Sequence, residues 1–372
     1  MLKDCEVDSM SDIQTYYRSV GELPSYGRFA SLDDLNAYLD FSPEKVRTFE
    51  QNPYLKTKET TAQLLGVADG KIIGAVGVFP LHVWADDKKY EACACPLIHV
   101  HPDYRKTLYG IDLSKATATV SADKMTINCG LSHMSAKMNK LFKTPVFPLR
   151  QFAYVKRSRL FFGERIPRWL CWLVLPLMDV AFAVHRCLVS LIVAIKTNGW
   201  IVERISVDDE NSVKEFCELV KDDPHRFREH IGPEWVNWVL TNDFFPLEVA
   251  DKRLYRVSLK GQTVGFFMTR LTEHGARGRI IEWQMAPGFE KALPWVMMLA
   301  ARLLVKKADA SIVALGEDEH DAIRTLKHWL LPFPNQHAVI GAHKTSPLRQ
   351  HDGWREAKNW RIRPAMGDGC FY

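Results

Sequence analysis

The sequence lacks the features that mark a secreted or metal-binding chain. Its first residues, Met1 to Glu6, include no apolar signal region. Its eight cysteines are dispersed, and only Cys93 and Cys95 stand close together, without a second Cys/His pair at zinc spacing. It also has no long run of like charge and no low-complexity segment. We therefore expect a reducing, cytoplasmic setting, buried free thiols at Cys93 and Cys95, and no metal site.

The length and composition of the sequence indicate a folded chain of more than one domain. Its 372 residues are more than a single hydrophobic core usually organises. The proportions of hydrophobic residues (47%) and charged residues (25%) are typical of a globular protein. The net charge of +5 is mildly basic, which permits an anionic ligand such as a nucleotide cofactor without requiring nucleic acid.

Residues 98–113 read as a strand that passes through a tight turn into a helix. The amides of residues 105–110 would be free donors at the helix start, and with the helix dipole they would form a site for phosphate or pyrophosphate. Gly110 would let a ligand approach the backbone closely. The alternative is an ordinary strand-to-helix turn that binds nothing.

This junction resembles the cofactor motif of the GNAT acyl-CoA N-acyltransferases, R/Q-x-x-G-x-G/A. Arg105 matches the first position and Gly110 the last, whereas Leu108 replaces the middle glycine. The resemblance implies a cofactor, acetyl-CoA or another acyl-CoA, with its pyrophosphate against the turn. The cofactor-binding residues that it implies are Val100, His101, Arg105, Lys106, Thr107, Leu108, Tyr109 and Gly110.

The predicted elements occur twice in the same order. The first series is a hairpin over 63–78, strands leading to His101, a helix, a strand at 125–129, a helix at 132–142 and a strand at 151–156. The second is a hairpin over 254–271, a strand at 279–285, a helix at 293–304, a strand at 311–315, a helix at 319–331 and a strand at 338–342.

We therefore predict an α/β (α+β) fold of two GNAT-like domains, each a mixed, mostly antiparallel sheet flanked by helices. Residues 1–160 would carry the cofactor motif, 161–200 would form an apolar helical linker, and 201–372 would be a degenerate domain. In that second domain, Phe289 and Glu290 stand where amides should face an anion, and a carboxylate there would repel pyrophosphate. FemAB-like aminoacyltransferases have the same doubled fold.

Residues 169–195 form an apolar segment long enough to span a bilayer. Pro176, Asp179 and Arg186 interrupt it near the middle, where charge is costly in hydrocarbon. We expect a pair of helices packed between the domains. One alternative is peripheral membrane contact, favoured by flanking basic residues beside Trp169 and Trp172, and the other is a transmembrane span.

The chemistry implied by the resemblance is direct attack of an amine on an acyl thioester. Such an attack needs a base, a donor for the oxyanion and an acid for the leaving thiolate. A backbone N–H near Val100 or His101 can supply the oxyanion donor. His99 is the preferred base or relay because an imidazole titrates in the right range, and Glu282, on the matching strand of the second half, is the alternative base.

The remaining candidates lie on the elements after the motif. His133 is the candidate acid, since residues 132–142 contain no tyrosine, and Asn128 is a candidate for orienting the substrate. For the histidines and for Glu282 the alternative is structural: a histidine bonded to a backbone carbonyl, or a salt-bridged carboxylate.

The sequence thus predicts a cytoplasmic N-acyltransferase, with membrane association open, that moves an acyl group from acyl-CoA to an amine-bearing acceptor; we expect an acetyl group. Two other classes stay open. A FemAB-like transferase would take an aminoacyl group from charged tRNA, which would make nucleic acid a partner. A non-catalytic module with a dead cofactor site is suggested by Leu108 and by the missing tyrosine.

Overall fold

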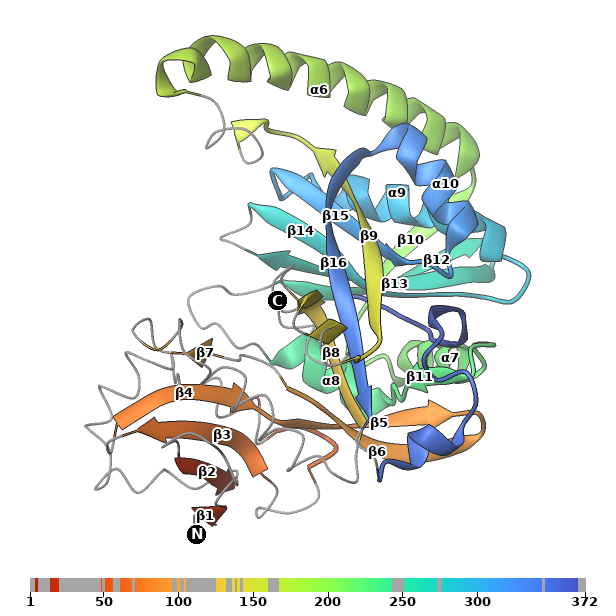
Figure 1. The fold of residues 1–372 in the computed structure, drawn as a ribbon. Helices are drawn as coiled ribbons and strands as arrows, with labels where there is room; N and C mark the ends of the chain where they lie inside the picture. Colours follow the sequence, from red (N-terminus) through yellow and green to blue (C-terminus); the bar gives the residue numbers. More distant parts are fainter. Residues whose placement is uncertain are drawn as a thin grey trace.

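A computed structural model gives the fold in two sheets and several covering helices (Figure 1). The structure describes residues 4–5, 14–19, 48, 51–55, 61–68, 71–95, 99–100, 104, 125–131, 136–137, 139–140, 143–159, 167–242, 251–272, 276–342 and 345–366.

The first half of the chain contributes strands to both sheets. A five-stranded sheet has the order β1 (Asp4–Cys5), β2 (Gln14–Ser19), β3 (Thr61–Ala68), β4 (Lys71–Gly77) and β7 (His99–Val100). The larger sheet takes β5 (Phe79–Ala85), β6 (Lys88–Ala94), β8 (Met125–Leu131) and β9 (Val146–Val155). The hairpin predicted over 63–78 is confirmed, because β3 and β4 pair antiparallel up to Ala68 and Lys71.

The second half begins with β10, α7, β11 and α8, and from β12 onward it follows the predicted order. Its strands are β10 (Trp200–Ile205), β11 (Phe227–Glu229), β12 (Lys252–Leu259), β13 (Gln262–Thr272), β14 (Arg277–Met285), β15 (Ala310–Gly316) and β16 (Leu331–Ala342). Its α-helices are α7 (Glu210–Lys221), α8 (Pro233–Thr241), α9 (Leu293–Leu304) and α10 (His320–Trp329), with short 3-10 turns at Glu290–Ala292, Pro347–Gln350 and Ala357–Asn359. The hairpin predicted over 254–271 is confirmed by the pairing of β12 with β13.

Local chemistry explains where these helices begin. Asp209 caps α7, its carboxylate accepting a hydrogen bond from the Ser212 amide at 3.1 Å. Proline stands in the first turn of α8 and of α9, where its missing N–H costs no helical hydrogen bond.

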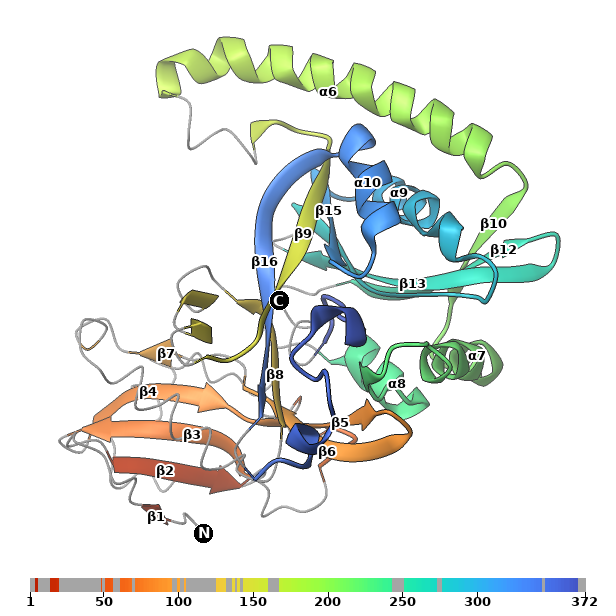
Figure 2. The same cartoon turned by 45° about the vertical axis from the view of Figure 1, so that its right-hand side comes forward.

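The two halves exchange their last strands. The larger sheet has eleven strands in the order β10-β12-β13-β14-β15-β9-β16-β8-β6-β5-β11. β9, from the first half, lies between β15 and β16, and β16, from the second half, pairs with β8 (Figure 2). We expected a separate sheet in each domain. The pairing of 149–155 with 310–316 joins distant segments, so local periodicity does not reveal it.

Hydrophobic residues pack on both faces of this sheet. One cluster gathers side chains of β5, β6, β8, α7 and α8, including Phe216 and Trp235. The other gathers β14, β15, α9 and α10, including Trp283 and Met297. β13 contributes Phe266 to the first cluster and Phe267 to the second, because successive residues of a strand point to opposite faces.

The apolar segment between the halves forms one continuous helix, α6 (Arg168–Lys196), which runs across the outside of the molecule (Figure 1). The predicted pair of helices packed between the domains is therefore wrong. Pro176 lies inside the helix, where it removes one N–H donor without ending the helix. Among the described residues, α6 is the one helix long and apolar enough to cross a membrane by length and composition.

Candidate functional site

Two places in the larger sheet depart from its antiparallel pairing. β6 pairs with β8 in parallel, but only from Ala92 to Cys93, and β14 pairs with β15 in parallel from Arg277 to Ile280. In each of these pairs, the two strands separate beyond the parallel stretch. We call the separation of β6 from β8 the first fork and that of β14 from β15 the second fork.

At the first fork the chain passes from one sheet to the other. After Cys93 it leaves β8, and at Val100 it pairs with Gly74 of β4 in the five-stranded sheet. The Cys95 amide donates to Asn128 Oδ1 at 2.7 Å, so the side chain of Asn128 bridges the base of the fork. Cys93 and Cys95 are buried free thiols, as predicted.

Most of the predicted site belongs to residues that the structure does not describe. The backbone of His99 pairs with Ala75, and Val100 is half-buried, so both lie on β7, the edge strand of the five-stranded sheet that the chain enters after the first fork. The side chain of His99 lies outside the described residues. So do the acid candidate and most of the cofactor set: His133, His101, Arg105, Lys106, Thr107, Leu108, Tyr109 and Gly110. Their roles stay predictions, as does the substrate role of Asn128.

The second fork is filled by the chain itself. Residues 360–366, here called the C-terminal segment, run alongside β14. The Ala365 amide donates to the Ile281 carbonyl at 2.7 Å, and the Arg361 guanidinium donates to the Trp283 carbonyl at 2.8 Å. The Arg363 guanidinium stacks over the Trp283 ring at 4.4 Å. Main-chain groups that β14 leaves unpaired at the fork thus find partners in this segment.

Buried ion pairs hold the C-terminal segment in place. Arg361, only 2% exposed, contacts Glu282 at 2.7 Å and Asp223 at 3.3 Å. Arg363 contacts Asp318 at 3.4 Å and Glu319 at 2.9 Å. The segment is therefore anchored by two cations against carboxylates from separate parts of the second half.

His225 links the ion pairs of Arg361 to those of Arg363. Its Nδ1 lies 2.5 Å from Asp223 and its Nε2 lies 3.3 Å from Asp318. Burial disfavours the charged imidazole, but the hydrogen bonds to the two carboxylates outweigh it and raise the pKa of His225 from 6.5 to about 9. Burial would raise the pKa of Asp223, yet the hydrogen bond from His225 and the charges of Arg361 and Arg363 hold that pKa well below its ordinary value.

Glu282, the alternative base, is part of this network. It is 1% exposed, and its Oε1 accepts hydrogen bonds from Arg361 at 2.7 Å and from the Trp283 amide at 2.8 Å. In this arrangement the carboxylate anchors the C-terminal segment. Its role as a base stays a prediction.

In the turn after β14, a side chain of the turn also binds one of the turn's own amides. Gly288, with φ of +85°, donates its amide to Glu290 Oε1 at 2.9 Å. Hydrogen bonds from the amides of Glu290 and Gly288 lower the pKa of the Glu290 carboxyl. A carboxylate therefore accepts the amides of this turn, and the loss of cofactor binding in the second half stays a prediction.

Sequence reasoning missed a polar chain on the β5–β6 hairpin. Tyr90 Oη lies 3.0 Å from His351 Nε2, and His351 Nδ1 lies 2.8 Å from Asp86. Hydrogen bonds from Arg226 and His351 lower the pKa of Asp86 to about 2. These residues are far apart in the sequence and form no motif, so no local signal could have grouped them.

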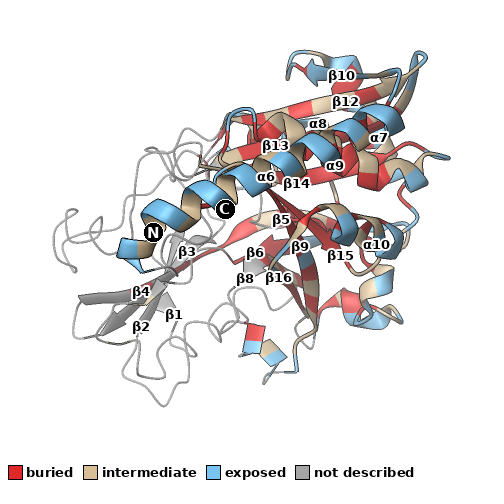
Figure 3. Ribbon diagram, turned by 90° about the horizontal axis from the view of Figure 1, so that it is seen from above, coloured by how far each residue is buried: buried red, intermediate tan, exposed pale blue. Residues whose placement is uncertain are grey.

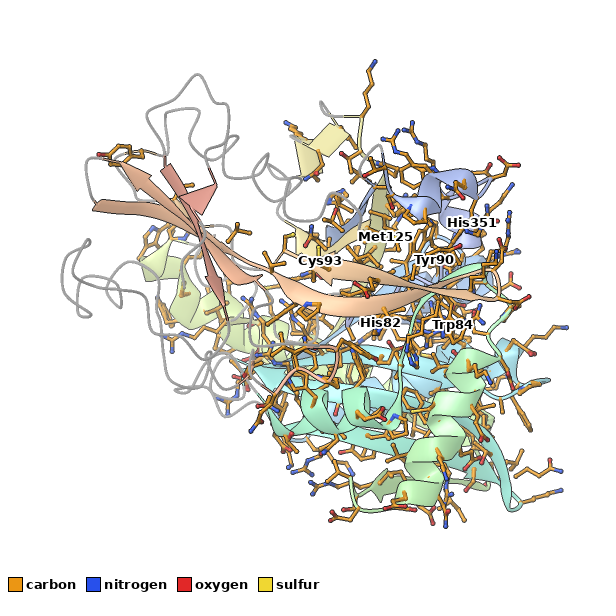
Figure 4. All side chains as sticks on the ribbon, turned by 90° about the horizontal axis from the view of Figure 1, so that it is seen from below. His82, Trp84, Tyr90, Cys93, Met125 and His351 are labelled. Carbon is orange, nitrogen blue, oxygen red and sulfur yellow. The ribbon has the colours of Figure 1, made fainter. Side chains whose placement is uncertain are left out.

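This polar chain borders a pocket that is separate from the first fork. The pocket, of about 260 Å³, is lined by Lys89, Tyr90, Glu91, Met125, Ser346, Pro347 and Leu348. Figure 4 shows Tyr90, Met125 and His351 on one side of the β5–β6 ribbon and His82 and Trp84 on the other. Met125 is the first residue of β8, whereas the fork opens beyond it, toward Asn128.

Comparison with known proteins finds similarity at the level of structure. No protein-family model matches the sequence, and no curated protein matches it. The structure is similar to Saccharomyces cerevisiae N-myristoyltransferase with bound myristoyl-CoA and inhibitors: TM-score 0.59, 13% identity, 92% of this chain and 83% of that chain. It is also similar to two GCN5-related N-acetyltransferases. The one from Anabaena variabilis has a TM-score of 0.50 and 10% identity, and the match covers 88% of this chain and 72% of that chain. The one from Kribbella flavida has a TM-score of 0.50 and 11% identity, and the match covers 88% of this chain and 70% of that chain.

These similarities extend over about nine tenths of the chain and show its fold. The chain has the fold of the GNAT-like acyltransferases, as the motif and the repeated element order predicted.

Proposed function

We propose that this protein is an N-acyltransferase that moves an acyl group from acyl-CoA to an amine. The observation that carries the proposal is the difference between the two forks of a GNAT-like fold. The C-terminal segment fills the second fork and Glu290 caps its turn. The first fork leads instead into Arg105–Gly110, the stretch that resembles the family's cofactor motif.

In the proposed reaction the amine nitrogen attacks the thioester carbon at the first fork. A C–N bond forms, the C–S bond breaks, and the thiolate of coenzyme A leaves. His99, on the strand β7 that follows the first fork, takes the proton from the amine directly or through water, and a backbone N–H near Val100 or His101 donates to the oxyanion. His133 supplies the proton that the thiolate needs.

The expected donor is acetyl-CoA. A longer acyl-CoA is the alternative, since one structural neighbour was solved with myristoyl-CoA. The pocket for the amine acceptor would lie between the first fork and the second half, with Asn128 at its base.

The test is direct binding of acyl-CoA to the full chain. Native mass spectrometry and calorimetric titration with acetyl-CoA and with myristoyl-CoA should give one donor per chain. Gly110→Glu should abolish binding by adding bulk and negative charge at the pyrophosphate contact. The matched control, Pro287→Ala in the exposed turn of the second half, should bind as the unchanged protein does.

Three results would contradict the proposal. Unchanged affinity of Gly110→Glu for acyl-CoA would show that the turn at residues 105–110 does not bind the cofactor. Failure to bind either donor would favour the non-catalytic module. A product that forms only with charged tRNA, together with salt-sensitive tRNA binding, would favour the FemAB-like transferase.

A further inference from the structure

Helix α6 turns its polar side chains toward the protein. Asp179 Oδ1 accepts the Ser158 amide at 2.5 Å, and Arg186 donates to the carbonyls of Val155 and Lys156 at 3.0 and 2.9 Å. The Tyr154 hydroxyl donates to the Arg186 carbonyl at 3.2 Å. The charged residues that interrupted the apolar segment in the sequence thus make hydrogen bonds to main-chain groups at the end of β9 and just after it.

The outward face of α6 is uncharged from Trp169 to Ile195, and Lys196 at the end is the one exposed charge that the structure describes on this helix. Its exposed residues recur every three or four positions and so form a stripe: Trp169, Trp172, Leu173, Pro176, Leu177, Val180, Ala181, Val184, Cys187, Leu188, Leu191, Ala194 and Ile195. Figure 3 shows this exposed stripe from above. Among the described residues, nine of the ten large apolar side chains that are exposed lie on α6; the other is Ile201.

This orientation is the reverse of that in an ordinary surface helix. A helix on a soluble protein buries its apolar stripe and exposes its polar one. Exposed apolar patches of more than a few hundred Å² mark sites of contact with another apolar body. With 29 residues, α6 is about 43 Å long, so its stripe is well above that size.

Basic residues beside the stripe point to the kind of partner. Arg157 and Arg159 are exposed on either side of Ser158, which contacts the middle of α6 at Leu175 and Asp179, and Lys196 is exposed at the end of the helix. Arg157 also lies 3.4 Å from Asp309. Trp169 and Trp172, 73% and 75% exposed, lie near one end, as aromatic residues do at the headgroup level of a bilayer. A long apolar stripe with basic residues beside it and no acidic residue on it complements an anionic lipid surface.

We propose that α6 lies flat in the interface of an anionic membrane, with its apolar stripe in the lipid and its inner face against the protein. The inner contacts oppose a transmembrane orientation. Val189 and Val193 are buried against the core that includes α9, and Asp179 and Arg186 bind the chain next to β9. A span would break these contacts and place both charges in hydrocarbon.

The experiment is flotation of the full chain with vesicles of phosphatidylcholine alone or mixed with phosphatidylglycerol. We expect binding to the anionic vesicles that weakens at high salt. Leu177→Glu with Leu188→Glu should lower the partition coefficient by more than about tenfold, because each change places a charge in the apolar stripe. Ile201→Glu is the matched control, an equally exposed apolar residue off the helix, and should bind as the unchanged protein does.

Circular dichroism and the unfolding midpoint establish that each variant is folded. Three outcomes would overturn the proposal. The first is no binding to either vesicle by a monomeric chain. The second is a dimer in analytical ultracentrifugation that Leu177→Glu with Leu188→Glu dissociates, which would make a second copy the partner. The third is protein that only detergent releases from expressing cells, which would make α6 a span.

Discussion

Replacing Arg361 by methionine should release the C-terminal segment from the second fork. Arg361 is 2% exposed and donates to Glu282, to the Trp283 carbonyl and to Gln284 at 2.7, 2.8 and 3.0 Å. Methionine keeps much of the side-chain length but none of the charge. The carboxylates of Glu282 and Asp223 would lose this cation while remaining buried.

Removing one partner of a buried ion pair costs about 3–5 kcal/mol, because the other charge stays desolvated and unpaired. We expect a loss of that size in the free energy of unfolding of Arg361→Met at pH 7, measured by urea titration followed by circular dichroism. The matched control is Arg226→Met. Arg226 also pairs with a carboxylate, that of Asp86, but both partners are well exposed, so only a small loss is expected.

A double-mutant cycle separates this account from a loss of packing. Glu282→Gln removes the charge that Arg361→Met leaves unpaired, so the combined variant should lose less stability than the sum of the two single variants. Equal losses for Arg361→Met and Arg226→Met would refute the reasoning. So would strict additivity with Glu282→Gln.

Three further predictions concern pH, catalysis and the cofactor. Folding raises the pKa of His225 from 6.5 to about 9, so the folded chain holds this proton more tightly than the unfolded chain does. The resulting contribution to stability is complete below pH 6.5 and is lost as pH rises through about 9. Stability should therefore fall by up to about 3 kcal/mol between pH 6.5 and 9.5 in the unchanged protein and stay flatter in His225→Gln, as urea titrations at each pH would reveal. His99→Ala should lower turnover about 10²- to 10⁴-fold with little change in acyl-CoA affinity, whereas an unchanged rate would exclude His99 as base or relay. Leu108→Gly should tighten acyl-CoA binding in a calorimetric titration if that side chain crowds the pyrophosphate, and unchanged affinity would show that it does not.

The sequence predicted elements whose signals are local. Alternating apolar residues around Ala68–Gly70 and Lys260–Gly261 gave both hairpins. The 3.6-residue spacing over 293–304 gave α9, and the buried apolar run at 311–315 gave β15. Each of these signals lies within about twenty residues, so a single sequence is enough to find it.

The features that the sequence did not reveal depend on distant partners. The exchange of β9 and β16 requires pairing across more than 150 residues. Arg361 and Arg363 look like ordinary surface cations until the fold brings Glu282, Asp318 and Asp223 to them. α6 was predicted as a pair of packed helices because Pro176, Asp179 and Arg186 interrupt the apolar segment and charge is costly in hydrocarbon, yet the chain around Ser158 satisfies both charged residues.

The forks also explain why the two halves of one architecture can differ in ligand binding. Where parallel strands separate, each loses a hydrogen-bonding neighbour, and buried main-chain groups need another partner. At the second fork the C-terminal segment supplies it, through the Ala365 amide and the Arg361 guanidinium. At the base of the first fork the Cys95 amide is satisfied by the side chain of Asn128. The pantetheine arm of coenzyme A carries two amide groups in an extended chain, which is the chemistry that unpaired strand edges accept. We therefore expect acyl-CoA to occupy the first fork as the C-terminal segment occupies the second. Loss of that segment's anchors should then disturb the second half without creating an anion site in the turn after β14, because the Glu290 carboxylate already accepts the Gly288 amide there.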